Sequence, residues 1–269
     1  IAQQASSGTW YYLTVTSGGA LAPAYRDSSL MVVGQDVPTG LKKHLRAAKA
    51  ALTGPALSPE TVTAVDSPPA IGAHKVVVLL AGFPGAAGRT DPSIWHDLIF
   101  GGAGSLKDYY ETASYGAFTI APAAESSGTA DDGIIGWLDL SAYFSTHPNP
   151  GSTVSDVNKY ITKRALAVGD TYINFATYDT DSNGSISSDE LHIIVIVAGF
   201  ERSYGGDDEP AVWANNSDLS GTVGAPTLDG KVIANASRGG SYSQVGEYHG
   251  DHPGSMGVIA HEFGHDLKW

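Results

Sequence analysis

The chain has 269 residues, no cysteine, and 28 acidic against 15 basic side chains, which gives a formal net charge of −13. The lack of cysteine excludes disulfides, thiolate zinc sites, iron–sulfur clusters and thiol catalysis, so a metal must be held by His, Asp, Glu or carbonyl oxygen. The acidic balance argues against nucleic acid or an anionic membrane surface as a partner, and no apolar stretch is long enough to span a membrane.

The first part of the chain is expected to fold as a unit of its own. An aromatic and β-branched run at 10–15 predicts a strand. Apolar residues at helical spacing between 41 and 52 predict a helix with a basic face, which is either solvated or docked on the acidic remainder. The proline-rich residues 54–73 indicate a linker. We therefore predict an N-terminal unit at 1–53, a linker at 54–73 and a larger domain at 74–269.

The larger domain mixes strands and helices without strict alternation. Continuous apolar runs at 75–81 and 193–197 predict strands buried on both faces. Between and around them, helical patterns cover about 93–99, 104–113 and 154–177, and a short strand is expected at 117–121. Residues 200–254 are rich in Gly, Ser and Asp, which predicts hairpins and loops around 232–234, and a last helix begins near residue 255. This order predicts an α+β domain with a mixed sheet.

Residues 179–190 match the twelve-residue calcium-binding loop position for position. Gly184 stands at the sixth position, where the loop needs a sharp turn. A single loop that leads into a strand favours a structural calcium ion over a regulatory pair, and the alternative is an Asx-rich turn that binds no ion. The candidate calcium ligands are Asp179, Asp181, Asn183, Ser185, Ser187 and Glu190.

The segment His261-Glu262-Phe263-Gly264-His265 contains two histidines four residues apart. On a helix these positions share one face, so both imidazoles can bind a single Zn²⁺. Glu262 then lies beside the metal, where it can take a proton from a water that the metal activates. The pattern therefore predicts His261 and His265 as zinc ligands and Glu262 as the catalytic general base. The alternative is a chance pattern on the helix surface.

These motifs and several shorter stretches resemble the secreted bacterial metalloproteases of the immune inhibitor A family, which are distant relatives of the metzincins. The final motif and the calcium loop are the specific parts of the likeness, and the others are suggestive. The matching pieces are Val76–Phe83, Lys107–Gly116, Asp179–Glu190, Ile193–Gly199 leading to Glu201, Val212–Ala214 and Gly257–Leu267, with Trp10–Tyr12 and Gly40–Arg46 similar to a propeptide end.

The resemblance implies a zincin- or metzincin-like catalytic domain with a mixed, twisted sheet and an active-site helix, preceded by a small propeptide-like unit. It implies zinc-dependent endopeptidase activity on proteins or peptides, stabilisation by calcium, and synthesis as a secreted zymogen. By the same likeness, His261 and His265 bind zinc, and Glu262 serves as general base and then as general acid. Contact between the propeptide-like unit and the catalytic domain is also expected.

The family motif continues with a glycine and then an aspartate that serves as third zinc ligand; here the glycine position is Lys268, and the aspartate position falls past Trp269. We therefore expect the chain to be a truncated form, a zymogen or an inactive member, or another group to complete the site. The upstream candidates are His249, His252, Asp251 and Glu247, and those of the N-terminal unit are His44 and Asp27. The competing hypothesis is a catalytically inactive or truncated calcium-binding extracellular protein with a degenerate protease fold. No motif indicates the substrate side-chain preference.

Overall fold

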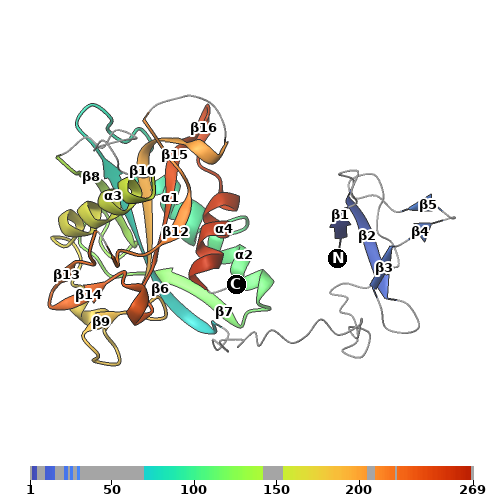
Figure 1. Ribbon diagram of the computed structural model, residues 1–269, viewed down its shortest axis with the longest axis horizontal. Helices are drawn as coiled ribbons and strands as arrows, with labels where there is room; N and C mark the ends of the chain where they lie inside the picture. Colours follow the sequence, from blue (N-terminus) through green and yellow to red (C-terminus); the bar gives the residue numbers. More distant parts are fainter. Residues whose placement is uncertain are drawn as a thin grey trace. The chain divides into compact units, whose positions relative to one another are not determined.

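The computed structural model describes residues 70–141, 154–204, 210–221 and 223–267 (Figure 1). For residues 154–156, and for five short strands between residues 2 and 30, it describes the backbone only. The chain divides into two compact units, Ile1–Asp66 and Ser67–Trp269. The predicted helix at 41–52 and most of the predicted linker lie outside the described residues. The boundaries proposed at 53 and 74 therefore stay a prediction.

The smaller unit contains two groups of antiparallel strands. Its three-stranded sheet has the order β1-β2-β3, and β4 pairs with β5. The strand predicted at 10–15 is confirmed as β2. The bounds are β1 (Ala2–Gln4), β2 (Trp10–Val15), β3 (Leu21–Pro23), β4 (Tyr25–Arg26) and β5 (Ser29–Leu30).

The larger unit is organised around a mixed eight-stranded sheet with the order β12-β15-β10-β6-β7. β8 also pairs with β6, β11 with β10, and β16 with β15; only β12 and β16 run antiparallel to their partner. The predicted α+β architecture with a mixed sheet is confirmed. The strands are β6 (Gly72–Gly82), β7 (Phe118–Pro122), β8 (Ile134–Asp139), β10 (His192–Glu201), β11 (Ala211–Val212), β12 (Asn215–Ser217), β15 (Tyr242–His249) and β16 (His252–Pro253).

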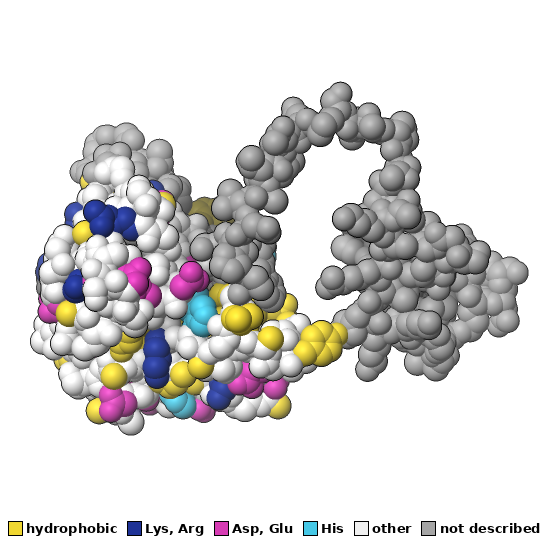
Figure 2. Space-filling model, turned by 90° about the horizontal axis from the view of Figure 1, so that it is seen from below, with side chains coloured by type: hydrophobic (Ala, Val, Ile, Leu, Met, Phe, Trp, Pro, Cys, Tyr) yellow, Lys and Arg dark blue, Asp and Glu magenta, His cyan; other side chains and the backbone are white. Residues whose placement is uncertain are grey.

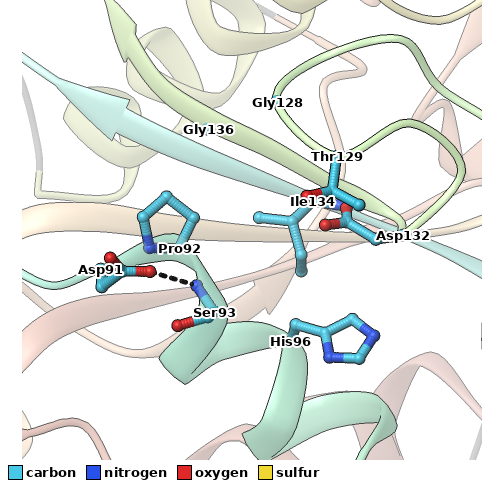
Figure 3. Close-up of a pocket in the computed structure, with 9 residues that line it drawn as sticks. All are labelled: Asp91, Pro92, Ser93, His96, Gly128, Thr129, Asp132, Ile134 and Gly136. Carbon is cyan, nitrogen blue, oxygen red and sulfur yellow. Dashed lines mark hydrogen bonds between the residues drawn. The ribbon is translucent and has the colours of Figure 1, made fainter.

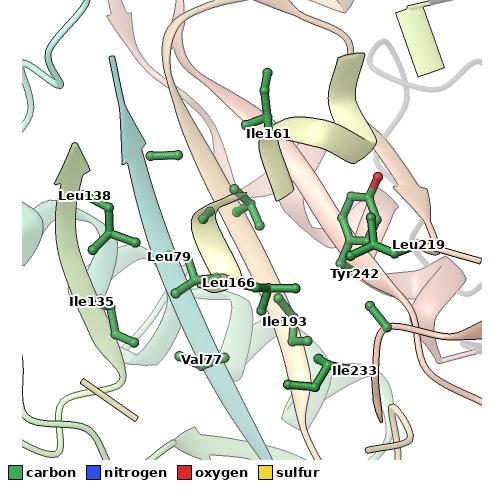
Figure 4. Packing of buried hydrophobic residues seen from close by; sticks show 14 of the residues in the cluster. Val77, Leu79, Ile135, Leu138, Ile161, Leu166, Ile193, Leu219, Ile233 and Tyr242 are labelled. Atoms are coloured by element: carbon green, nitrogen blue, oxygen red, sulfur yellow. The ribbon is translucent and has the colours of Figure 1, made fainter. Parts of the chain in front are cut away.

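Helices cover both faces of this sheet. Because successive side chains of a strand point to opposite faces, neighbouring residues of one strand pack in different layers. Val77 and Leu79 of β6 pack with α3, whereas Val76 and Val78 pack with α1, α2 and α4. Figure 4 shows the first of these two layers, in which side chains from β6, β8, β10 and α3 meet. Burial on both faces explains why β6 and β10 are continuous apolar runs. The helices are α1 (Pro92–Phe100), α2 (Leu106–Ala113), α3 (Val154–Gly169) and α4 (Met256–Asp266).

Within the Gly-, Ser- and Asp-rich residues 200–254, the strand β15 was not predicted; it is buried and runs parallel to β10. Its sequence lacks an apolar run because Ser243, Gln244 and Glu247 are buried polar residues within it. Gly246 is required there by close approach, since a Cβ at this position would lie 2.5 Å from the Glu201 backbone nitrogen. The hairpin expected around 232–234 is confirmed as β13 (Thr227–Leu228) with β14 (Lys231–Ile233).

The helix predicted over 154–177 is wrong in its last third, residues 170–177. α3 ends at Gly169, where a Cβ would lie 2.9 Å from Leu79, so the helix end packs closely on β6. A turn and a short 3₁₀ helix, Phe175–Tyr178, follow and lead into the predicted calcium loop. The strand β8 was not predicted. The remaining short elements are β9 (Ser185–Ile186) and the 3₁₀ turns Arg202–Tyr204 and Ala236–Arg238.

On the face of the larger unit shown in Figure 2, positive and negative side chains are dispersed among apolar and neutral polar ones. None of the helices in the described part of the chain combines the length and apolarity needed to cross a bilayer.

Candidate metal centre

The predicted zinc motif lies on α4, which follows the N-cap Ser255. Ile259 and Phe263, one helical turn apart, are buried against the α1, α2 and β6 side of the core. Their burial fixes the rotation of the helix about its axis, and this rotation leaves His261 and His265 exposed to solvent. The apolar stripe of α4 therefore determines where the two imidazoles point.

The structure brings His261, Glu262 and His265 together as one cluster. One ligand atom from each residue lies within 4.8 Å of the others, and the centroids of the two imidazole rings are 4.9 Å apart. Two imidazoles on one helix face with a carboxylate beside them are a donor set that suits zinc better than calcium or magnesium. The cluster therefore fits zinc by the chemistry of its donors.

Glu262 is 8% exposed, unlike the two histidines that flank it. Burial raises the pKa of its carboxyl group, and the two neighbouring imidazoles and a hydrogen bond from the Asn216 backbone partly offset this effect. A carboxylate with a raised pKa holds a proton more readily than an exposed one, which suits a group that takes up a proton and returns it. Asn216 belongs to β12, so this bond also joins α4 to the last strand of the sheet.

The helix α2 packs against α4 through Tyr110. The Tyr110 hydroxyl donates a hydrogen bond of 2.6 Å to the Ala260 carbonyl, and the Tyr110 ring is almost fully buried. A Cβ at Gly264 would lie 3.2 Å from that hydroxyl oxygen. The glycine inside the motif therefore lets the two helices pack closely.

The upstream groups considered as a third zinc ligand are not part of this cluster. Glu247 is fully buried and accepts hydrogen bonds from the Arg89 and Thr90 backbone nitrogens, both at 2.6 Å. His249 is 1% exposed and stacks on Tyr204, and its Nε2 atom has no hydrogen-bond partner among the described residues. His252 lies beside His249 at the surface.

Asp251 is exposed. Among the described residues it belongs neither to the cluster of His261, Glu262 and His265 nor to the other possible metal-binding cluster. His44 and Asp27 lie outside the described residues. The third ligand therefore stays a prediction.

The predicted calcium loop forms a second cluster. Carboxylate oxygens of Asp179, Asp181 and Glu190 lie within 4.8 Å of one another. The loop turns through positive φ at Ser182 and at Gly184, where φ is 82°. Three converging carboxylates in a tightly wound loop are hard oxygen donors of the kind that calcium prefers, so the residues fit that ion.

The remaining predicted ligands hold this loop together. The Asn183 backbone nitrogen donates to Asp179 Oδ1 at 2.9 Å and to Asp181 Oδ1 at 3.0 Å. Ser187 donates to Glu190 Oε2 through both its backbone nitrogen and its hydroxyl, each at 2.9 Å. The Ser185 side chain accepts from Arg238 at 3.0 Å, so only its carbonyl suits the ligand role that the seventh position has in such loops.

Positive charge and hydrogen bonds keep the loop carboxylates ionised. The hydrogen bond from Lys231, whose Nζ lies 2.5 Å from Asp179 Oδ2, is the main cause that lowers the pKa of Asp179. Burial opposes ionisation of Glu190, but hydrogen bonds from Ser187 and Thr180 outweigh it and lower the pKa of that carboxyl group. The loop is therefore anionic at neutral pH.

A buried carboxylate on α4 was not predicted from the sequence. Asp266 is 4% exposed, and Nδ1 of His192 on β10 donates a hydrogen bond to it. A signal was present in the sequence, because Asp266 follows Ile259 and Phe263 at positions that share one helical face. A carboxylate on an otherwise apolar face indicates a buried partner.

A cavity of about 430 Å³ lies between the start of α1 and β8 (Figure 3). Asp91 and Asp132 on its wall accept hydrogen bonds from nearby backbone nitrogens, those of Ser93 and Ile134. None of the lining residues belongs to either metal cluster. The chemistry of the clusters, and not the position of this cavity, therefore locates the candidate site.

Comparison with known families agrees with this geometry. The family model described as "Immune inhibitor A peptidase M6, catalytic domain" matches residues 91–269, well over half of the chain. A comparison with curated proteins gives no match. The matched range contains both clusters but begins after β6, so the likeness of Val76–Phe83 to the family stays a prediction. The match identifies a metallopeptidase domain, and the chain belongs to the immune inhibitor A peptidase M6 family.

Proposed function

We propose that this protein is a secreted zinc-dependent endopeptidase that hydrolyses peptide bonds in protein substrates and is stabilised by calcium. The observation that carries the proposal is the cluster of His261, Glu262 and His265 on one face of α4. Membership of a metallopeptidase family supports it, and the resemblance to secreted bacterial proteases supports the localisation. The propeptide-like role of residues 1–53 is part of the same proposal.

In this proposal His261 and His265 hold the zinc ion. Bound zinc supplies Lewis-acid polarisation of the scissile carbonyl and activation of a water molecule. The Glu262 carboxylate accepts the proton of the attacking water and donates it to the nitrogen of the leaving amine. The burial that raises the pKa of Glu262 suits both steps, because the group must hold the proton between them.

The strand β12 is placed to orient a substrate. In the described part of the chain it is the last strand on its side of the sheet, and Asn216 within it is hydrogen-bonded to Glu262. An extended peptide can add to the free edge of such a strand through backbone hydrogen bonds. We propose that the substrate lies along β12, which brings its peptide bonds next to Glu262.

The test of the enzymatic proposal is the response of casein hydrolysis to zinc. Protein freed of metals is expected to be inactive, and about one equivalent of zinc is expected to restore hydrolysis. Hydrolysis that is the same with and without zinc contradicts the proposal. A protein that binds no zinc supports the competing assignment as a calcium-binding protein with a degenerate protease fold.

The calcium loop gives a separate prediction about stability. Adding calcium to protein freed of metals is expected to raise the thermal midpoint by about 5 °C, because an ion bound only by the folded state stabilises that state. Magnesium at the same concentration is expected to have a smaller effect, since it prefers a smaller octahedral site. The measurement is calorimetry with each ion in turn.

Two matched variants complete this test. Asp181→Asn removes a loop charge and is expected to abolish most of the response to calcium. Asp97→Asn removes an exposed carboxylate on α1, 81% exposed at its side chain, and is expected to respond like the unmodified protein. An unchanged midpoint with calcium contradicts the structural role of the loop.

A further inference from the structure

A buried link joins the calcium loop to the zinc helix. Asp266 on α4 accepts a hydrogen bond of 2.6 Å from the Ser188 hydroxyl through its Oδ1 atom. The Ser241 hydroxyl donates to the same oxygen, and His192 Nδ1 donates to Oδ2. Asp266, Ser188 and His192 are 4%, 2% and 1% exposed. Hydrogen bonds to an ionised group in such surroundings are strong and directional.

Each end of this link lies next to a metal ligand. Ser188 belongs to the calcium loop and precedes Glu190 by two residues, while Asp266 directly follows His265. The link therefore connects segments 78 residues apart in the chain, and it does so at the two motifs that the proposed function uses. Its position is not explained by the packing of α4 alone, because Ile259 and Phe263 already bury the helix against the core.

The loop and Ser188 are expected to move together. The Ser188 backbone nitrogen donates to the Gly239 carbonyl at 3.0 Å, and the Leu191 backbone nitrogen donates to the Ser187 carbonyl at 3.1 Å. The first bond joins the end of the loop to the end of the 3₁₀ turn Ala236–Arg238, and the second closes a local turn. Lys231 compensates part of the charge of Asp179, and the repulsion that remains among the three carboxylates within 4.8 Å is relieved when a metal cation binds. Binding of a cation thus determines how firmly the turn that carries Ser188 is held.

We propose that Ser188, Asp266 and His192 couple the two metal sites, so that calcium in the loop fixes the last turn of α4 and raises the affinity of His261 and His265 for zinc. The coupling is reciprocal, since a ligand that favours a second ligand is favoured by it to the same degree. Asp266 is a positioning residue in this scheme because it acts through His265. The inference rests on the proposed function, as it assumes that both clusters bind their metals.

The experiment measures zinc affinity by competition with a chromophoric chelator, on protein freed of metals with a chelating resin, in the presence of calcium or of magnesium. For the unmodified protein we expect calcium to tighten zinc binding about tenfold relative to magnesium, a typical size for such coupling. The absorption spectrum of the cobalt-substituted protein gives a second readout, which we expect to change when calcium is added.

Variants separate coupling from a general loss of structure. Ser188→Ala removes the hydroxyl and keeps the buried contact between His192 and Asp266, so we expect the effect of calcium on zinc affinity to fall below about threefold. Ser127→Ala removes a hydroxyl of similar burial that accepts a bond from the Gly136 backbone nitrogen, and we expect it to keep the full effect. Asp266→Asn is expected to reduce the effect of calcium as Ser188→Ala does. It is also expected to bind zinc more weakly than the unmodified protein, both with calcium and with magnesium present.

The outcomes distinguish the coupling from the proposed function. Zinc that binds with the same affinity in calcium and in magnesium overturns the coupling and leaves the enzymatic proposal intact. Equal coupling in Ser188→Ala and Ser127→Ala overturns the assigned route, since a merely structural role of Ser188 lowers stability without changing the ratio of affinities. A protein that binds no zinc in either ion overturns both.

Discussion

Replacement of Glu262 by Gln is expected to lower casein hydrolysis by at least about a hundredfold, because an amide cannot accept the proton of the attacking water. Its shape and its burial are nearly unchanged, so the helix and both histidines are expected to stay in place. Zinc content should therefore remain about the same as in the unmodified protein. The measurement is kcat/KM together with bound zinc on the same preparation.

Two control variants separate loss of the general base from loss of zinc and from the general effect of removing a carboxylate. His265→Ala is expected to lose both activity and zinc, since it removes a ligand and not the base. Glu111→Gln alters a half-exposed carboxylate on α2 and is expected to keep most of the activity. Activity that survives in Glu262→Gln would exclude Glu262 as the general base, and loss of zinc in that variant would instead make it a ligand.

Replacement of Asp266 by Asn is expected to lower the free energy of unfolding by about 3 kcal/mol at pH 7, because it removes the buried negative charge that strengthens the hydrogen bonds from His192, Ser188 and Ser241. Burial alone would raise the pKa of Asp266, but His192 beside it and the hydrogen bonds from His192, Ser188 and Ser241 lower it. A carboxylate with a lowered pKa stabilises the folded state above its ordinary pKa of about 4. That contribution is lost as the pH falls through the pKa of the folded state.

The difference between the two proteins is therefore expected to be largest near neutral pH and to shrink as the pH falls below about 4. Urea unfolding in the presence of EDTA, at a series of pH values, measures it without contributions from either metal. Asp97→Asn on the surface of α1 should change the free energy by less than about 0.5 kcal/mol at every pH. A difference for Asp266→Asn that does not depend on pH argues against an ionised Asp266.

Those parts of the fold that have a local signal could be predicted from the sequence. The apolar runs of β6 and β10 indicated strands buried on both faces, and both lie in the middle of the sheet. β15 could not be recognised in this way, because its buried residues Gln244 and Glu247 are polar. Its residue Gly246 is required by the close approach of the β10 backbone, which the sequence does not reveal. The end of α3 depends likewise on close packing against Leu79, a contact distant in sequence.

The same distinction holds for the candidate site. His261, Glu262 and His265 lie on one helical turn, and the calcium loop is a single short segment, so their spacing in the sequence was enough to predict that each forms a cluster. The pairing of Asp266 with His192 and Ser188 joins residues more than 70 positions apart. Periodicity can mark Asp266 as buried but cannot name its partner, which is determined by the order of strands in the sheet.

The proposed function depends above all on a zinc ion held on α4 by His261 and His265. The most direct measurement is X-ray diffraction from crystals of the zinc-loaded protein, with data collected on both sides of the zinc absorption edge. We expect one anomalous difference peak bonded to a ring nitrogen of each histidine, with the Glu262 carboxylate beside it and not bonded to it. An anomalous peak elsewhere, or none at α4, would contradict this expectation.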